Sequence, residues 1–292
     1  MKKPLEDKKD IELLQSLLQK AVRRGNADIV RRVIQCLVRS GNLEWLRRRA
    51  AVLVFEECWT YGHEFNNESD EFELTEQFVH LARTIKNKNA CGLGSLAYHS
   101  SLGAEMAIVS DSLENDLRVI CAALGKPQPF WEWSNRRVEN EKQKKLLQNA
   151  QRGFVEADLP WDRAFMLAAT YLSFTANVPE KKFSNRVPGE FPFWIAIDRH
   201  TTLGVEKITE AANQINLEPE LALWLTFYFE GAQCHEMVPS PWWEQERIWR
   251  LKSLGLKMEE GKLAFEKLKP ILIELLREEA KKLSEIILNV ET

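Results

Sequence analysis

Apolar side chains recur every three or four residues along most of this chain, which is the spacing of one face of an α-helix. The first such face comprises Ile11, Leu14, Leu18 and Ala21. Gly25 ends this run, and Asn26 can cap a second helix that stops at Gly41. Asn42 can cap a third helix that ends near Gly62. Helices joined by loops this short pack as close neighbours.

The same periodicity predicts helices along the rest of the chain. The predicted elements after the first three are helices at 74–85, 96–109, 113–124, 131–151, 203–215 and 219–229. Pro160 and the pair Ser240-Pro241 are typical N-terminal signals for two further helices, and Pro270 is expected to begin the last one. No stretch alternates convincingly between apolar and polar residues as a strand does. The sequence therefore predicts an all-α, multi-helix bundle.

The clearest linker lies at 177–193, which contains three prolines and a glycine in addition to polar residues. This segment divides the chain into a helical domain at 1–176 and a smaller helical region at 194–292, or it crosses a single domain as a long loop. A chain of 292 residues is long enough for either arrangement to bury a real core.

The composition is that of a globular, cytoplasmic protein. Hydrophobic residues make up 45% and charged residues 28%, which excludes wholesale disorder. The charged N-terminus is followed by no apolar signal segment, and the longest apolar stretch, at 221–229, is too short to cross a bilayer. We therefore expect a cytoplasmic location and no membrane partner. The five cysteines form no CxxC pair, which favours reduced thiols in the core.

Charge is unevenly distributed, although the formal net charge is only -3. Residues 1–50 hold thirteen Lys and Arg against six acidic residues, and a strongly acidic stretch follows at 64–76. A basic block of this kind is a solvated surface, an intersubunit contact or a phosphate-binding face. On the last hypothesis, the residues that contact nucleic acid or an acidic partner are Arg23, Arg24, Arg47, Arg48 and Arg49.

The sequence carries no recognisable catalytic or cofactor-binding motif. It has no GxxxxGK[ST] phosphate loop and no GxSxG elbow, and Gly92-Leu-Gly94 lacks the third glycine of a dinucleotide-binding turn. We therefore expect no cofactor, no metal ion and no catalytic residue. A metal site assembled from distant helices stays open as an alternative, for example from His63, Glu64 and His235.

Tryptophans suggest further contact surfaces. Trp242, Trp243 and Trp249 are candidates for an interface with a protein partner, although such residues also fill helical cores. Trp133 lies beside Arg136 and Arg137, a combination of residue types that can stack on nucleic-acid bases. The apolar stripe near the C-terminus either closes the core or leaves an oligomerisation surface. Its members are Leu272, Leu275, Leu276, Leu283, Ile286 and Ile287.

Two stretches resemble a known family. The segment Leu17-Leu-Gln-Lys-Ala-Val-Arg-Arg-Gly-Asn-Ala-Asp, with the segments at 34–41 and 46–53, is similar to the helical C-terminal collar of clamp-loader-like AAA+ ATPases. Within that class, it resembles the replication-associated recombination protein A and Werner-helicase-interacting ATPase family. The positions that carry the likeness are Lys20, Gly25, Gly41, Arg48, Arg49, Glu56 and Glu57. A second stretch, Asp198-Arg-His200-Thr201-Thr-Leu-Gly204, resembles an Asp-x-His-Thr-x-x-Gly motif in the more distal part of such proteins.

The resemblance implies a collar-like fold that mediates assembly. The chain departs from the family because Walker A, Walker B and the sensor arginine are all missing, so ATP hydrolysis does not carry over. It is then a C-terminal fragment or a free-standing collar-like protein. We expect a non-enzymatic binding and assembly module of DNA replication, recombination or repair. Its candidate partners are DNA, replication or AAA+ proteins, and a second copy of the chain.

Two alternatives from other functional classes stay open. One is a helical metal-dependent hydrolase with an interior site of His, Asp and Glu side chains, in which Asp198, His200 or His235 would take part. The other is a regulatory protein that binds another protein through an exposed, tryptophan-rich surface.

Overall fold

The chain folds into helices that pack around one continuous apolar core. The computed structural model describes residues 8–66, 68–105, 111–176 and 182–290. Within these residues it contains fourteen α-helices, no named strand and only three isolated β-bridges. The prediction of an all-α, multi-helix bundle is therefore confirmed. None of the helices in these ranges is both long and apolar enough to cross a membrane.

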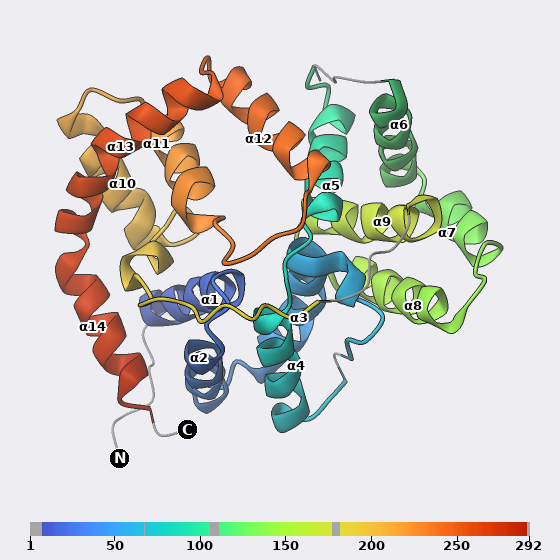
Figure 1. The fold of residues 1–292 in the computed structure, drawn as a ribbon, viewed down its shortest axis with the longest axis horizontal. Coiled ribbons are helices and arrows are strands. Elements are labelled where there is room, and N and C mark those ends of the chain that lie inside the picture. Colours follow the sequence, from blue (N-terminus) through green and yellow to red (C-terminus); the bar gives the residue numbers. More distant parts are fainter. Residues whose placement is uncertain (1–7, 67, 106–110, 177–181, 291–292) are drawn as a thin grey trace.

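The first four helices form the lower centre of the molecule in Figure 1: α1 Lys8–Arg23, α2 Ala27–Arg39, α3 Leu43–Cys58 and α4 Glu71–Arg83. Gly25 takes a φ of +73°, which ends α1, and the Asn26 side chain accepts a hydrogen bond from the Ile29 amide at 3.1 Å. Gly41, with a φ of +75°, follows α2 in the same way. Asn42 occupies the predicted N-cap position of α3, but its side chain makes no capping hydrogen bond and its amide donates to the Ser40 carbonyl.

The next five helices lie on the right in Figure 1: α5 Asn89–Ser101, α6 Asp111–Gly125, α7 Pro127–Asn135, α8 Glu141–Glu156 and α9 Pro160–Thr175. Pro160 opens α9 as predicted. The single helix predicted at 131–151 is wrong, because Asn140 caps α8 through the Gln143 amide and separates it from α7. The helix predicted at 96–109 begins earlier, at Asn89, and is followed by Gly103 with a φ of +90°.

The remaining helices lie on the left and top: α10 Thr202–Gln214, α11 Pro219–Thr226, α12 Pro241–Ser253, α13 Met258–Leu275 and α14 Arg277–Leu288. Short helical turns occur at η1 Trp59–Tyr61, η2 Phe193–Ala196 and η3 Phe227–Gly231. Pro270 does not begin a helix as predicted but lies inside α13. Most of the C-terminal apolar stripe closes the core, since Leu272, Leu276, Leu283 and Ile287 are buried.

Helices from both sides of the predicted linker pack against each other. Helix α12 contacts α5, α14 contacts α2, and α1 contacts both η2 and α10. The described part of the linker is 182–193; it contains no helix before Phe193, where η2 begins, and its first residues run along the end of α4 and the segment that follows it. There, the Ile85 amide donates to the Lys182 carbonyl and the Ser184 amide donates to the Arg83 carbonyl, both at 2.9 Å. These contacts tie the linker and the C-terminal helices to the N-terminal ones.

One close contact between two helices depends on a glycine. A Cβ atom added at Gly92 in α5 would lie 2.3 Å from the backbone nitrogen of Trp243 in α12. Backbone cannot move aside as a side chain can, so only glycine fits this position. Gly92 therefore fixes how closely α12 approaches α5.

We expect Gly92→Ala to lower the free energy of unfolding by roughly 1–3 kcal/mol, the usual cost of overpacking a core. The control is Gly125→Ala, because nothing lies within 4 Å of a Cβ added at Gly125. Urea titration followed by circular dichroism measures both variants. Equal unfolding midpoints for the two variants would contradict the steric argument.

Candidate functional site

The Asp198–Gly204 motif forms the entry to α10, and each of its key residues has a local role. The Thr201 hydroxyl caps α10 by accepting the Gly204 amide at 3.0 Å. A Cβ atom at Gly204 would lie 1.9 Å from the Asp198 carbonyl oxygen, so the turn requires glycine. The Asp198 side chain accepts the His200 amide at 3.0 Å. The motif therefore holds the Asp198 carboxylate in the interior.

Asp198 meets a buried lysine from the first helix. Lys20 Nζ lies 2.5 Å from Asp198 Oδ2, and both side chains are almost completely buried. Ser16, one turn earlier on α1, donates its hydroxyl to Asp198 Oδ1 at 3.3 Å and accepts from Lys20 at 2.9 Å. Two sequence stretches that carried the family resemblance, one around Lys20 and one around Asp198, are thus joined by a buried ion pair.

A second set of buried ion pairs lies next to the first. Arg23 Nη2 contacts Glu56 Oε1 at 2.7 Å, and Arg23 Nε contacts Glu57 Oε1 at 2.5 Å. Lys88 Nζ contacts the other Glu57 oxygen at 3.2 Å. The remaining Arg23 nitrogen, Nη1, donates to the Gly231 carbonyl at 3.1 Å. We call Lys20, Arg23, Glu56, Glu57, Lys88 and Asp198 the central charge cluster; its three cations balance its three carboxylates.

The pKa shifts follow from this pairing. Burial alone would raise the pKa of Asp198, but Lys20 and His200 hold it well below its ordinary value. Burial also opposes ionisation of Glu56, yet Arg23, Lys88 and Arg49 lower its pKa to about 2. Both carboxyl groups are therefore ionised at neutral pH.

His200 is the accessible member of the motif. Its Nδ1 lies 3.0 Å from Asp198 Oδ2, while 48% of its side chain is exposed. Desolvation lowers the pKa of His200, and Asp198 opposes that shift. The motif thus presents an imidazole to solvent beside a carboxylate that Lys20 already neutralises.

The five arginines predicted to contact nucleic acid do not form one open face. Arg23 is only 1% exposed and lies in the central charge cluster. Arg24 Nη2 contacts Glu230 Oε1 at 2.7 Å, and Arg49 Nη1 contacts the buried Asp162 at 2.7 Å. For Arg23 and Arg49 the structure corrects the prediction, because both guanidinium groups are already paired with internal carboxylates.

Arg47 and Arg48 lie at the surface, but acidic residues surround them. Arg47 Nη2 donates to the Ser69 carbonyl at 3.4 Å. The Arg48 side chain is 45% exposed and lies 3.9 Å from Asp158. The shallow surface pocket that contains both arginines is otherwise lined by Glu44, Glu68 and Glu156. This face is therefore of mixed charge.

The tryptophan surface predicted to bind a protein is mostly internal. Trp242 and Trp243 in α12 are buried, the Trp243 ring packs on Phe227 and Tyr228, and Lys88 Nζ lies 4.5 Å from the Trp243 ring centre. Trp249 is half-buried, and its indole N–H donates to the Glu105 carbonyl at 2.9 Å. Trp242 and Trp243 thus fill the core and offer no surface to a partner, which corrects the prediction.

A metal site is not assembled within the described residues. No three or more His, Cys, Asp or Glu side chains there are grouped so that they could hold a metal ion. His63 lies 3.5 Å from Glu64, whereas His235 Nε2 contacts the Arg186 carbonyl at 3.2 Å. The set proposed from sequence is therefore not brought together.

An exposed basic surface occurs instead at the junction of α7 and α8, on the right of Figure 1. The cations there, which we call the basic corner, are Arg136, Arg137, Lys142, Lys144 and Lys145, and all are exposed. Two acidic residues, Glu139 and Glu141, lie among them, and Glu141 contacts Lys144 at 3.6 Å. The Arg137 guanidinium lies 4.8 Å from the ring centre of Trp133. This pair is the one that the sequence singled out for base stacking.

The sequence analysis gave Lys88 no role. It gave Lys20, Glu56 and Glu57 no role except as positions that carry the family resemblance. The available signal was a charged residue inside an apolar helical run. Lys20 lies between Leu18 and Ala21–Val22, on the face that the periodicity already predicts to be buried. A charge in such a position requires an internal partner.

Comparisons of this chain with protein-family models, with curated proteins and with solved structures gave no match.

We expect Asp198→Asn to lower the free energy of unfolding by about 3–5 kcal/mol, because it leaves Lys20 buried without a counter-charge. The control is the double variant Lys20→Met/Asp198→Asn, which removes both charges and should lose less than the sum of the two single variants. Urea unfolding of the four proteins gives the coupling energy. Strictly additive losses would mean that the two side chains do not form the pair.

The low pKa of Glu56 gives a pH-dependent prediction. A carboxyl group with a folded-state pKa of about 2 and an ordinary value of 4.5 stabilises the fold above pH 4.5. That stabilisation, on the order of 3 kcal/mol, is lost as the pH falls toward 2. The difference in unfolding free energy between wild type and Glu56→Gln should therefore shrink to about half near pH 3.5. A difference that is constant from pH 7 to pH 3.5 would contradict the assignment.

Proposed function

We propose that this chain is a non-enzymatic binding and assembly module that contacts DNA in replication, recombination or repair. The observation that carries the proposal is the basic corner, where five exposed cations and two exposed acidic residues lie between Arg136 and Lys145 in the chain. A surface of this kind attracts the phosphate backbone and gains affinity by releasing condensed counterions.

Neither of the two alternative functions, a metal-dependent hydrolase or a tryptophan-mediated regulatory protein, has a matching site among the described residues, which supports this proposal. A metal-dependent hydrolase needs several grouped ligands, and the described residues contain no such group. A tryptophan-mediated regulator needs an exposed aromatic surface, but Trp242 and Trp243 are buried. The carboxylates of the central charge cluster are each held by cations, which suits a rigid scaffold better than acid–base catalysis.

The partners follow from the resemblance to the clamp-loader collar. A collar of that family assembles subunits, so an AAA+ or replication protein, or a second copy of this chain, is the proposed assembly partner. The contact to DNA shifts from the first fifty residues to the basic corner, with Arg47 and Arg48 in a secondary role. Arg137 on Trp133 supplies a flat cationic surface on which an unpaired base can stack.

We expect the chain to bind DNA with a strong dependence on salt, measured by fluorescence polarisation against single-stranded, duplex and forked DNA. Replacing the five basic-corner residues by alanine should weaken binding at least about tenfold. It should also reduce the salt slope by up to about 0.9 for each phosphate that the variant no longer neutralises.

The matched control removes five cations elsewhere, on α12, α13 and α14. Its substitutions to alanine are at the exposed residues Lys252, Lys262, Lys267, Lys281 and Lys282. A second variant, Arg47→Ala/Arg48→Ala, separates the contribution of the mixed-charge face. No binding by the wild type at low salt, or equal affinities of the corner and control variants, would overturn the DNA-contact proposal.

A further inference from the structure

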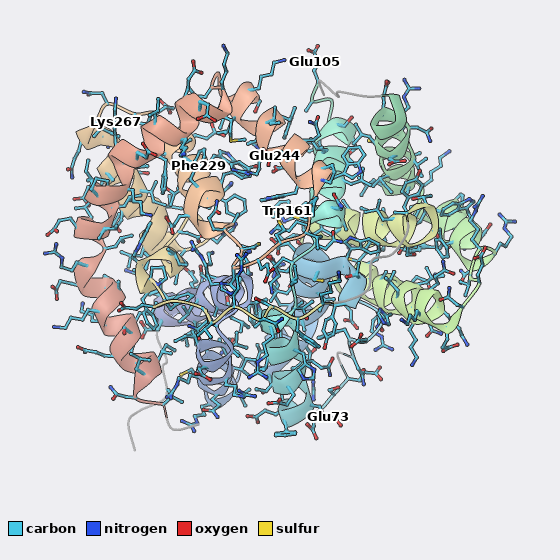
Figure 2. All side chains as sticks on the ribbon, viewed as in Figure 1. Glu73, Glu105, Trp161, Phe229, Glu244 and Lys267 are labelled. Atoms are coloured by element: carbon cyan, nitrogen blue, oxygen red, sulfur yellow. The ribbon has the colours of Figure 1, made fainter. Side chains whose placement is uncertain are left out.

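Arg199, next to Asp198 in the motif, holds its charge in an unusual setting. Its guanidinium carbon lies 3.5 Å from the ring centre of Trp224 and 5.9 Å from that of Phe227. The side chain is partly buried, and burial lowers the pKa of Arg199. Figure 2 shows side chains in the region between α11 and α12, with Phe229 and Glu244 labelled.

This guanidinium has no hydrogen-bond acceptor among the described residues. Among the described residues, every other partly buried arginine makes a hydrogen bond or an ion pair. Arg199 makes neither. Every buried cation of the central charge cluster, by contrast, has a carboxylate partner. No Arg199 nitrogen is among the enclosed side-chain nitrogen and oxygen atoms that lack a hydrogen-bond partner, so its N–H donors reach solvent. The N–H edge of this guanidinium is therefore open to a ligand from solution.

A second arginine stands against the same tryptophan. The Arg250 guanidinium carbon lies 4.2 Å from the Trp224 ring centre and 4.4 Å from that of Trp249. Its Nη2 contacts His99 Nε2 at 2.6 Å, while its buried Nε has no hydrogen-bond partner among the described residues. Burial, Arg250 and Arg199 lower the pKa of His99 to about 4, so His99 is neutral at pH 7 and accepts this hydrogen bond.

Nearby acids leave a surplus of positive charge. Asp198 is neutralised by Lys20. Glu246 Oε1 accepts from the Tyr228 hydroxyl at 2.6 Å and from Ser95 at 3.2 Å, and Arg250 Nε lies 4.0 Å away. Burial raises the pKa of Glu246. Two guanidinium groups therefore lie near one carboxylate without a cationic partner of its own, that of Glu246, and the exposed His200 follows Arg199 in the chain.

The geometry points to a binding site for the oxyanion group of a small ligand, a phosphate or a carboxylate, at Arg199, with the Arg250 guanidinium against the same Trp224 ring. Stacking on Trp224 occupies the flat face of the guanidinium and leaves its N–H edge free. That edge matches the two oxygens of a carboxylate or phosphate. Trp224 thus holds the Arg199 guanidinium in place before a ligand binds, which lowers the entropy lost on binding.

The test is isothermal titration calorimetry of the full chain with inorganic phosphate and, separately, with acetate at constant ionic strength and pH 7. We expect saturable binding of at least one anion, and the preferred one identifies the ligand group. Arg199→Gln should weaken that binding about 10–100-fold, the value of one or two charge-assisted hydrogen bonds. Arg199→Lys keeps the charge but loses the fork, so its affinity should be intermediate.

The matched control is Arg163→Gln, which removes an exposed arginine that also lies on an aromatic ring, that of Phe154. It should bind the anion as the wild type does, and so should the five-alanine variant of the basic corner. This last result separates the site from DNA binding. Absence of saturable binding of both anions to the wild type, or wild-type affinity of a folded Arg199→Gln variant, would overturn the inference.

Discussion

Ion pairing in the interior is the constraint on which this fold depends. Lys20 and Arg23 project from α1 into the buried interior, where an unpaired charge costs several kcal/mol. Their partners come from α3 and from the turn before α10, and Lys88 joins from the start of α5. Apolar packing alone tolerates many arrangements of helices, whereas these pairs require one register. The central charge cluster thus determines how the C-terminal helices sit on the N-terminal ones.

Local sequence signals predicted the helices wherever those signals act alone. Asn26, the positive-φ glycines at 25 and 41, and Pro160 mark helix ends whatever surrounds them, and the structure agrees. Errors arose where signals competed. The polar stretch from 131 to 151 was predicted as one long helix, but Asn140 interrupts it. Pro270 was predicted to begin a helix, but α13 continues through it. Such outcomes depend on tertiary packing, which a single sequence does not contain.

The candidate site was predictable only as a set of residues. Arg23 and Arg48 look alike in the sequence, yet one is enclosed by two glutamates and the other is exposed. The Asp198–Gly204 motif was found, but its contact with Lys20 joins positions far apart in the chain. Arg199 lay inside that motif without being singled out, because its lack of an acceptor is a property of the fold.

The distance along the chain between the paired residues also affects the order of folding during synthesis. Ser16 and Asp198 are 182 residues apart, whereas Arg23 and Glu57 are only 34 apart. A ribosome adding about 5–20 residues per second takes on the order of 10–40 s to cover the longer interval. During that time the nascent α1 can pair Arg23 with α3, but Lys20 must stay hydrated because its carboxylate has not yet been made. Helix α1 therefore waits for most of the described chain to be synthesised before its charged face is fully enclosed.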